Sequence, residues 1–179
     1  MKKTALVSLL ALSCCYMQAC QDNRIAKNYN QKTLLDDAGL AFIHNANEAD
    51  NTEIASASLA EKQSQNPRVI NFAKMMIADH STMSKQLKEF AKSKYVTMRS
   101  GDSVTVDDKG KLTALSGKTG ADFDKAYMQM MIEDHQKAIQ VFHDATNNTN
   151  ASLTSFAEKA LTKLQMHLDS AKAISVSLK

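Results

Sequence analysis

Apolar residues recur every three or four positions along four long stretches of the chain, which is the spacing of an amphipathic α-helix. These stretches cover approximately residues 34–64, 67–94, 121–146 and 151–179. Asn66 and Pro67 separate the first two stretches, and this pair is typical of a helix N-cap followed by the first helical residue. A polar turn at 147–150 separates the last two. The pattern therefore predicts two helical hairpins.

Residues 96–120, which connect the two hairpins, differ in composition and hold four of the five glycines. Two short runs at 103–106 and 111–114 flank Asp107–Gly110, and this arrangement predicts a small β-hairpin. Helices of about 28 residues are about 42 Å long, and the connection can run that far. We therefore expect an all-α, ferritin-like four-helix bundle with a long crossover between its second and third helices. An up-down-up-down bundle with a loose loop is the alternative.

The N-terminus carries the pattern of a protein that is exported. Lysines at the second and third positions precede an apolar run at 5–12, which is too short to span a bilayer. The pattern predicts a signal peptide at 1–19. It is followed by a polar tether at 20–33 and by the bundle domain at 34–179.

All three cysteines lie in or beside this leader, so the bundle domain has no disulfide framework. Residues 17–20 resemble a bacterial lipobox, which predicts that Cys20 is lipidated and becomes the first mature residue. Cys14 is the competing position, and a plain signal peptide is the alternative. A lipid on Cys20 would hold the domain at a membrane surface. We therefore expect an exported, lipid-anchored protein of the cell envelope, in the outer membrane or the periplasm.

Composition and charge exclude several classes of protein. Hydrophobic residues make up 44% of the chain and charged residues 23%, which are globular values and exclude a disordered chain. The net charge of +3 is small and spread along the chain, so we expect no nucleic-acid partner. No glycine-rich phosphate loop and no Ser-His-Asp order occur. The motifs therefore do not predict an enzyme.

Each predicted helix has one polar residue within its apolar stripe, where a core residue is expected. These four residues are Glu53, His80, His135 and His167. Glu53 and His80 lie at nearly equal distances from the turn that joins their helices, so they should face each other. His135 and His167 differ in height by about one helical turn, roughly 6 Å. We expect all four near the middle of the bundle.

Three imidazoles and a carboxylate that converge inside a bundle can bind a divalent metal ion, and zinc, iron or copper suits these donors. The alternative is a buried network in which the four side chains hydrogen-bond to one another or to water. Thioethers beside histidines suit copper(I), although methionine at helical spacing more often fills core space. The methionines in this region are Met75, Met76, Met83, Met128, Met130, Met131 and Met166. A dinuclear iron centre is disfavoured, because no Glu-x-x-His motif occurs.

Three aspartates accompany these histidines. Asp79 and Asp134 each precede a histidine, within hexapeptides 75–80 and 130–135 that are identical at five of six positions. One residue turns a helix by about 100°, so neither aspartate shares a face with its neighbour. Each could accept a hydrogen bond from a histidine on another helix, and ion pairs with lysines are the alternative. Asp124, on the stripe of the third helix, either has the same outer role or is a charge at the helix N-terminus.

Several of these residues together resemble a known family, the domain of unknown function 4142. The resemblance covers approximately residues 37–176. It rests on residues 72–80, which end in Asp-His, on the Asp-Phe-Asp-x-x-Tyr element at 122–127, and on His135 and His167.

The resemblance implies a fold and a location rather than a reaction. Members of the family are exported bacterial proteins, often labelled outer-membrane proteins, with a ferritin-like helical bundle and no established activity. Glu53 matches the glutamate of the family's first helix. Residues 47–51 replace the glycine-rich stretch that usually precedes this glutamate.

Three functional hypotheses follow. The first is an envelope lipoprotein whose bundle binds a divalent metal ion at the four buried polar residues, for storage, sensing or protection. The second is a non-catalytic structural or interaction module, with an unidentified partner, in which the same residues form a hydrogen-bonded network. The third is an enzyme that uses the same site, which requires a pocket and an open coordination position.

Overall fold

The computed structural model describes residues 34–98 and 104–178. The helices are α2 (Asp37–Gln63), α3 (Pro67–Ser93), α4 (Val106–Ser116), α5 (Gly120–Ala145) and α6 (Ala151–Ser177). The predicted signal peptide, Cys20 and the tether at 20–33 lie outside the described residues. No described helix combines the length and the hydropathy that a membrane-spanning segment needs.

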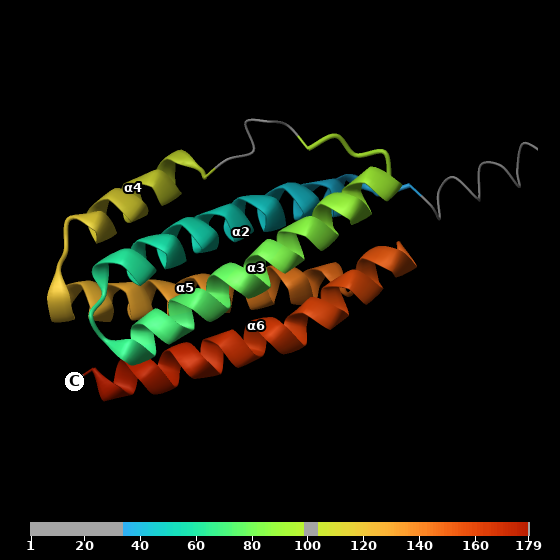
Figure 1. Cartoon of the computed structure of the whole chain (residues 1–179). Coiled ribbons are helices and arrows are strands. Elements are labelled where there is room, and N and C mark those ends of the chain that lie inside the picture. The colour runs from blue at the N-terminus through green and yellow to red at the C-terminus, as the bar shows by residue number, and fades with distance from the viewer. Residues whose placement is uncertain (1–33, 99–103, 179) are drawn as a thin grey trace, which may run out of the picture. The chain divides into compact units, whose positions relative to one another are not determined.

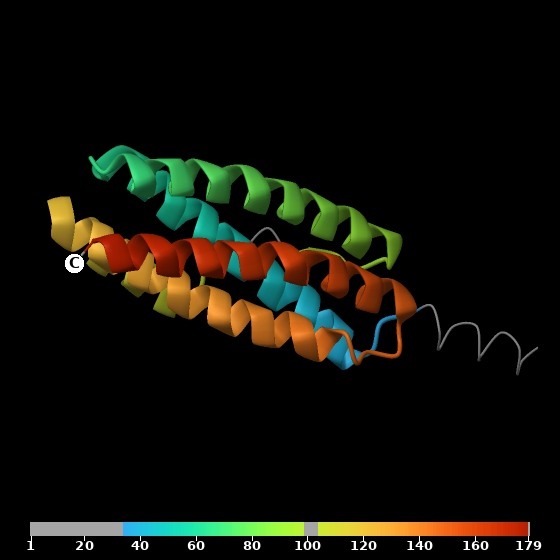
Figure 2. The same ribbon diagram turned by 90° about the horizontal axis from the view of Figure 1, so that it is seen from below.

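The four long helices form an all-α bundle, as predicted, in which α2 pairs with α3 and α5 pairs with α6 (Figure 1). The helices of each pair are antiparallel, whereas α3 and α5 point in the same direction (Figures 1 and 2). The connection between α3 and α5 must therefore return along the bundle, which is the ferritin-like order and not the up-down alternative. Helix α2 also packs against α5, and α3 against α6.

The β-hairpin predicted for 103–114 is wrong, because most of this segment forms helix α4 on the outside of the bundle against α2 and α5. Thr105 is its N-cap, and its hydroxyl accepts a hydrogen bond of 3.1 Å from the backbone N–H of Asp108. Asp107 and Asp108 occupy the first turn, where negative charge stabilises a helix. Leu115 is buried and attaches the helix to the core.

The predicted ends of the long helices are confirmed to within a few residues, because side-chain caps define them. The Asn66 side chain accepts a 2.9 Å hydrogen bond from the N–H of Arg68, and Asn150 caps α6 through the N–H of Leu153 at 3.2 Å. Gly120, the first residue of α5, has φ +58°, a conformation that glycine adopts without strain at the turn between α4 and α5.

Buried apolar residues fill the bundle on both sides of its middle. Toward the α2–α3 turn the cluster includes Ala57, Phe72, Met76, Tyr127 and Met131. Toward the other end Phe42 and Phe142 meet edge to face, with their ring centroids 4.9 Å apart. The buried histidines lie between these two regions.

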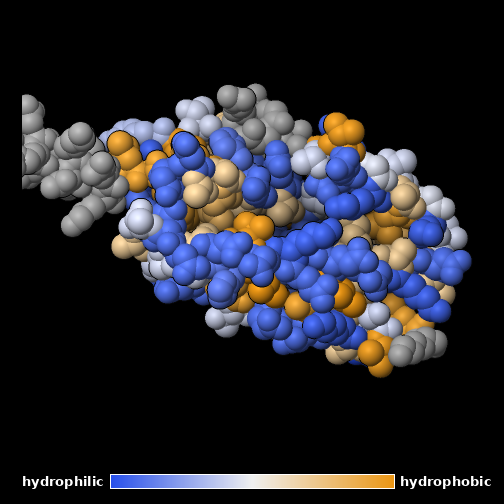
Figure 3. All heavy atoms as spheres, turned by 180° about the vertical axis from the view of Figure 1, so that it is seen from behind, coloured by the Kyte–Doolittle hydropathy of each residue, from blue (hydrophilic) through white to orange (hydrophobic). Residues whose placement is uncertain are grey.

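Polar residues cover most of the outside of the bundle. Figure 3 shows that the face opposite to that of Figure 1 is largely hydrophilic, with apolar residues in small separate groups. This surface is the outer face that four amphipathic helices are expected to present. The stability of the domain therefore depends on the interior, where polar side chains are few and each needs a partner.

Candidate metal centre

The structure brings together the four polar residues that interrupt the apolar stripes, each from a different long helix. Glu53, His80, His135 and His167 are all at most 2% exposed. His80 Nδ1 lies 2.8 Å from Glu53 Oε2, so these two residues face each other as predicted. The rings of His135 and His167 meet despite their expected offset, with centroids 5.3 Å apart.

One nitrogen of each imidazole ring is held by an acceptor at the periphery of the cluster. His80 Nδ1 lies 2.9 Å from Asp50 Oδ1, as well as 2.8 Å from Glu53. His135 Nδ1 donates to the backbone carbonyl of Met131 at 2.9 Å. His167 Nε2 donates to Asp79 Oδ2 at 2.9 Å. Carbonyl and carboxylate oxygens only accept, so each of these nitrogens carries its proton.

The other nitrogens of His135 and His167 face each other, and the His80 ring lies beside them. His80 Nε2 is buried and has no hydrogen-bond partner, and His135 Nε2 lies 3.3 Å from His167 Nδ1. One ring nitrogen from each histidine lies within 4.8 Å of the others. In a neutral imidazole whose proton is on the outer nitrogen, the inner nitrogen has a free lone pair. His135 and His167 each offer such a lone pair, and His80 offers a third once it is neutral, which is what a cation requires.

The carboxylates around His80 set the charge of the centre. Burial alone would lower the pKa of His80, but the charge of Glu53 and the hydrogen bonds to Asp50 and Glu53 raise it to about 10. The same ion pair outweighs burial and lowers the pKa of Glu53. Burial raises the pKa of Asp50. Without a metal the centre therefore holds a His80–Glu53 ion pair at neutral pH.

The other two histidines behave differently, because burial dominates. Burial lowers the pKa of His135, and it lowers that of His167 to about 4 despite the hydrogen bond to Asp79. Both rings are therefore neutral at physiological pH. Neutral imidazole is the form that binds metal ions.

The two aspartates of the repeated hexapeptide have different surroundings. Asp79 satisfies both predicted roles at once, because it accepts from His167 and also pairs with Lys163 Nζ at 2.9 Å. Asp134 bonds to none of the three histidines in the described part of the chain. Its Oδ1 instead lies 3.6 Å from Lys111 Nζ and 3.8 Å from Lys137 Nζ, which agrees with the lysine alternative.

Asp124 is buried near the start of α5, at 6% exposure. Among the described residues it forms no hydrogen bond or ion pair with the three histidines, so the predicted outer role finds no support. Its Oδ1 is buried without a hydrogen-bond partner. Its place close to the first turn of α5 agrees with the alternative interpretation, a charge at the helix N-terminus.

Sequence reasoning missed Asp50, which is only 4% exposed and completes a second group of ligand-type residues with Glu53 and His80. The signal was present, because Asp50 lies three residues before Glu53 and shares its helix face. The polar run at 47–51 hid this signal, since such a run is normally solvent-exposed. Asn47 in the same run is also buried.

The methionines of the region mainly fill the core. Met76, Met128 and Met131 are fully buried, and Met83 nearly so. Met75 and Met130 pack against the core from partly buried positions. Met166 is 44% exposed on α6. The structure therefore supports a packing role for most of them rather than a thioether site.

Three solved structures resemble the bundle. A DUF305 fragment from Deinococcus radiodurans has a TM-score of 0.73 at 10% identity, covering 80% of this chain and 99% of that one. A DUF305 protein from Streptomyces coelicolor, predicted to be secreted, has a TM-score of 0.68 at 10% identity, covering 79% and 93%. CopM in its Cu(II)-bound form has a TM-score of 0.62 at 17% identity, covering 79% and 97%. At these identities the likeness establishes the fold alone.

The comparison with curated proteins gives no match. The family resemblance in the sequence is confirmed. The model of the family described as domain of unknown function DUF4142 matches residues 26–174, most of the chain, and the chain therefore belongs to this family.

Proposed function

We propose that the protein is a metal-binding domain of the cell envelope that holds one divalent transition-metal ion at His80, His135 and His167. The observation that carries the proposal is the convergence of three inner ring nitrogens whose outer nitrogens are already bonded. Outer partners of this kind orient the histidines of metal sites and fix their tautomers. Glu53 offsets part of the charge of the ion.

The donor set favours a nitrogen-seeking ion. Calcium and magnesium prefer oxygen ligands, whereas three imidazoles suit zinc or copper(II), with iron as the remaining candidate. The bundle of CopM, which has been solved with Cu(II) bound, supports the inclusion of copper. The structure offers three imidazole ligands, and a fourth position remains for water, because the Glu53 oxygens lie beside the outer nitrogens of His80 and His135.

Metal binding must be coupled to loss of a proton from His80. Its pKa of about 10 means that Nε2 carries a proton in the metal-free protein at neutral pH. An ion at the centre replaces this proton, while Nδ1 keeps its own proton and its bonds to the two carboxylates. The local charge therefore rises by about one unit instead of two.

The proposal includes a location. Export with lipidation of Cys20 would place the domain at a membrane surface on a short tether. The leader pattern at 1–19 supports this, and a predicted secreted protein shares the fold. Storage, sensing or protection against excess metal would suit a buried site of this kind in the envelope.

The alternative function is a structural or interaction module in which the polar cluster only stabilises the bundle. The ion pair of His80 with Glu53 favours it, because these groups satisfy each other without a metal. The two functions differ in one respect: metal binding requires His80 to lose a proton, whereas a structural network keeps His80 charged beside Glu53.

Elemental mass spectrometry on the full chain, purified without chelators, tests the proposal. We expect about one zinc or copper ion per chain, retained in His143→Gln and lost in His135→Gln and His167→Gln. His143 is the matched control because it is an exposed histidine on α5. Circular dichroism should show the same helical content in all variants. Protein that is metal-free and takes up no zinc, copper or iron on titration would refute the proposal.

A further inference from the structure

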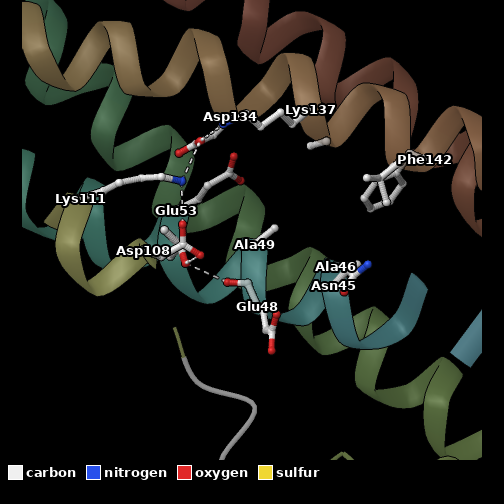
Figure 4. Close-up of a pocket in the computed structure, with 13 residues that line it drawn as sticks. Asn45, Ala46, Glu48, Ala49, Glu53, Asp108, Lys111, Asp134, Lys137 and Phe142 are labelled. Atoms are coloured by element: carbon white, nitrogen blue, oxygen red, sulfur yellow. Dashed lines mark hydrogen bonds and ion pairs between the residues drawn. The ribbon is translucent and has the colours of Figure 1, made fainter. Parts of the chain in front are cut away.

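A cavity of about 210 Å³ opens between α2, α4 and α5. It adjoins the metal centre, because Glu53 forms part of its wall (Figure 4). Its other charged side chains are Glu48, Asp108, Lys111, Asp134 and Lys137, and Ala138 and Phe142 are among the apolar ones. A hydrated ion fits a space of this size, since about 30 Å³ holds one water in the liquid.

Glu53 connects this cavity to the histidines. The residue is 2% exposed, and its Oε2 pairs with His80. Its Oε1 accepts no hydrogen bond and lies 3.3 Å from His135 Nδ1. The carboxylate therefore lies between the cavity and the outer nitrogens of two of the three proposed ligands.

Asp79 accepts a hydrogen bond from a histidine, whereas Asp134 needs a cation to balance its charge. Asp79 faces a histidine that donates a proton to it, whereas Asp134 lines the cavity with a second carboxylate, that of Glu53. A carboxylate cannot donate a hydrogen bond to another. Asp134 Oδ2 is accordingly buried without a hydrogen-bond partner.

Lys137 Nζ lies 3.8 Å from Asp134 Oδ1, and Lys111 of α4 supplies the nearer positive charge. Its Nζ lies 2.7 Å from Asp108 Oδ1 and 3.6 Å from Asp134 Oδ1, and Figure 4 shows it between the two carboxylates. Its side chain is 41% exposed, so it can leave this position for solvent without a change in the fold. The ammonium thus occupies the place of a mobile cation.

We propose that this cavity is the access route to the metal centre, and that Asp108 and Asp134 form an outer, transient site for a divalent cation that Lys111 fills when no ion is passing. The inference rests on the proposed function. An incoming ion displaces the Lys111 ammonium, binds the two carboxylates, and passes by way of Glu53 Oε1 to the imidazoles. Oxygen ligands bind zinc or copper less tightly than imidazoles, so the ion moves inward.

A second cavity, between α3 and α6, is the competing route. It is larger, about 510 Å³, and Asp79 and Lys163 line it. None of the four central residues belongs to its wall. An ion coming from that side would have to break the hydrogen bond between Asp79 and His167 that orients a ligand. The cavity beside Glu53 needs only the displacement of an exposed lysine.

Stopped-flow measurement of Zn²⁺ uptake and release by the metal-free full chain tests the route. We expect Asp134→Asn to slow the uptake and the release of Zn²⁺ together by about tenfold. The acidic side chains of the cavity concentrate cations there, and a site on the route lowers the barrier to both entry and exit. The equilibrium Kd should change by less than about threefold, since Asp134 is not a final ligand. Lys111→Met should accelerate both rates.

Two variants are matched controls for these changes. Asp144→Asn makes the same charge change on α5, where Asp144 is exposed and bonded to Gln140. Lys159→Met removes a lysine from the competing cavity. Both should leave the rates within about twofold of the wild type, as surface changes away from the route.

The outcomes separate the route from the function. Rates unchanged in Asp134→Asn and Lys111→Met, with Zn²⁺ still bound, would overturn the route and leave the metal centre standing. If Asp134→Asn weakens Zn²⁺ binding by the same factor by which it changes only one of the two rates, Asp134 is part of the final site. That result would also overturn the route. A chain that binds no Zn²⁺ or Cu²⁺ at equilibrium would overturn both proposals.

Discussion

The hydrogen bond from His167 to Asp79 offers a sharp test of the metal centre, because Asp79 belongs to no other part of it. Asp79 Oδ2 lies 2.9 Å from His167 Nε2, and this bond keeps the proton on Nε2 and leaves Nδ1 free for a metal. Asp79→Asn keeps the size of the side chain but removes the negative charge. The amide can also rotate to present its NH₂ group, which favours the opposite tautomer of His167.

The expected magnitude follows from the exposure of this pair. Loss of such an outer partner typically weakens metal binding by about 10–100-fold, or about 1.4–2.7 kcal/mol. The Asp79 side chain is 22% exposed and shares its charge with Lys163, so solvent and the lysine already weaken its effect. We therefore expect the lower end, about tenfold. The metal-free protein should lose less than about 2 kcal/mol and stay folded.

Competitive titration of Zn²⁺ against a chromophoric chelator measures this change. Lys163→Met is the matched control, because it removes the other partner of Asp79 and leaves the bond to His167 in place. Its affinity should stay within about threefold of the wild type. In parallel, ¹⁵N chemical shifts should place the proton of metal-free His167 on Nε2. An unchanged affinity in Asp79→Asn, or a proton on Nδ1 in the wild type, would refute this reasoning.

Three further predictions concern the metal-free protein. Burial lowers the pKa of His167 to about 4, against 6.5 in an unfolded chain, so the unfolded state binds the proton more readily and stability falls as the pH drops from 6.5 toward 4. The raised pKa of His80, about 10, contributes stability that is complete below pH 6.5 and is lost as the pH rises toward 10. The free energy of unfolding in urea should therefore be greatest near pH 6.5. Glu53→Gln should cost about 3 kcal/mol in urea unfolding, because it leaves the buried His80 with one carboxylate partner, Asp50, in place of two. Asn66→Ala should cost about 1 kcal/mol by the same assay, through loss of the α3 N-cap.

Each of these predictions has a control. Stability that does not change between pH 6.5 and 4 would contradict the neutral state of His167. Adding His80→Gln to Glu53→Gln should recover part of the lost stability, since the buried positive charge is then gone, and no recovery would contradict the ion-pair argument. Asp122→Asn, an exposed change in the first turn of α5, should stay within about 0.5 kcal/mol.

Features that depend on neighbours in the chain were predictable. The helix ends near Asn66 and Asn150 follow from side chains that bond to the backbone two or three residues away. Glu53, His80 and His167 stood out because a polar residue in an apolar stripe must be buried when the stripe is buried. The period of the pattern therefore determined the bundle and the four central residues of its polar cluster, although not Asp50.

Helix α4 shows where this reasoning fails. Asp107–Gly110 can form a turn or the first turn of a helix, because the same short polar residues favour both. The burial of Leu115 against the bundle, and the hydrogen bonds that Asp108 accepts from Thr52 and Lys111, accompany the helical outcome. Thr52 lies on another helix, so no local pattern could include that contact.

The sequence by itself determined the four-helix fold, its caps and the four central residues, since all of these follow from helical periodicity and local hydrogen bonding. Only the tertiary structure decided which nitrogen of each histidine points inward. That choice depends on acceptors such as Asp79, which lies 88 residues before His167 in the sequence. Asp79 is on α3 and accepts a hydrogen bond from His167 on the neighbouring helix α6. It also brought Asp50 to His80 and placed Lys111 beside Asp134. The chemistry of the centre is set by these long-range contacts, because a tautomer and a charge are properties of a pair of residues and not of one.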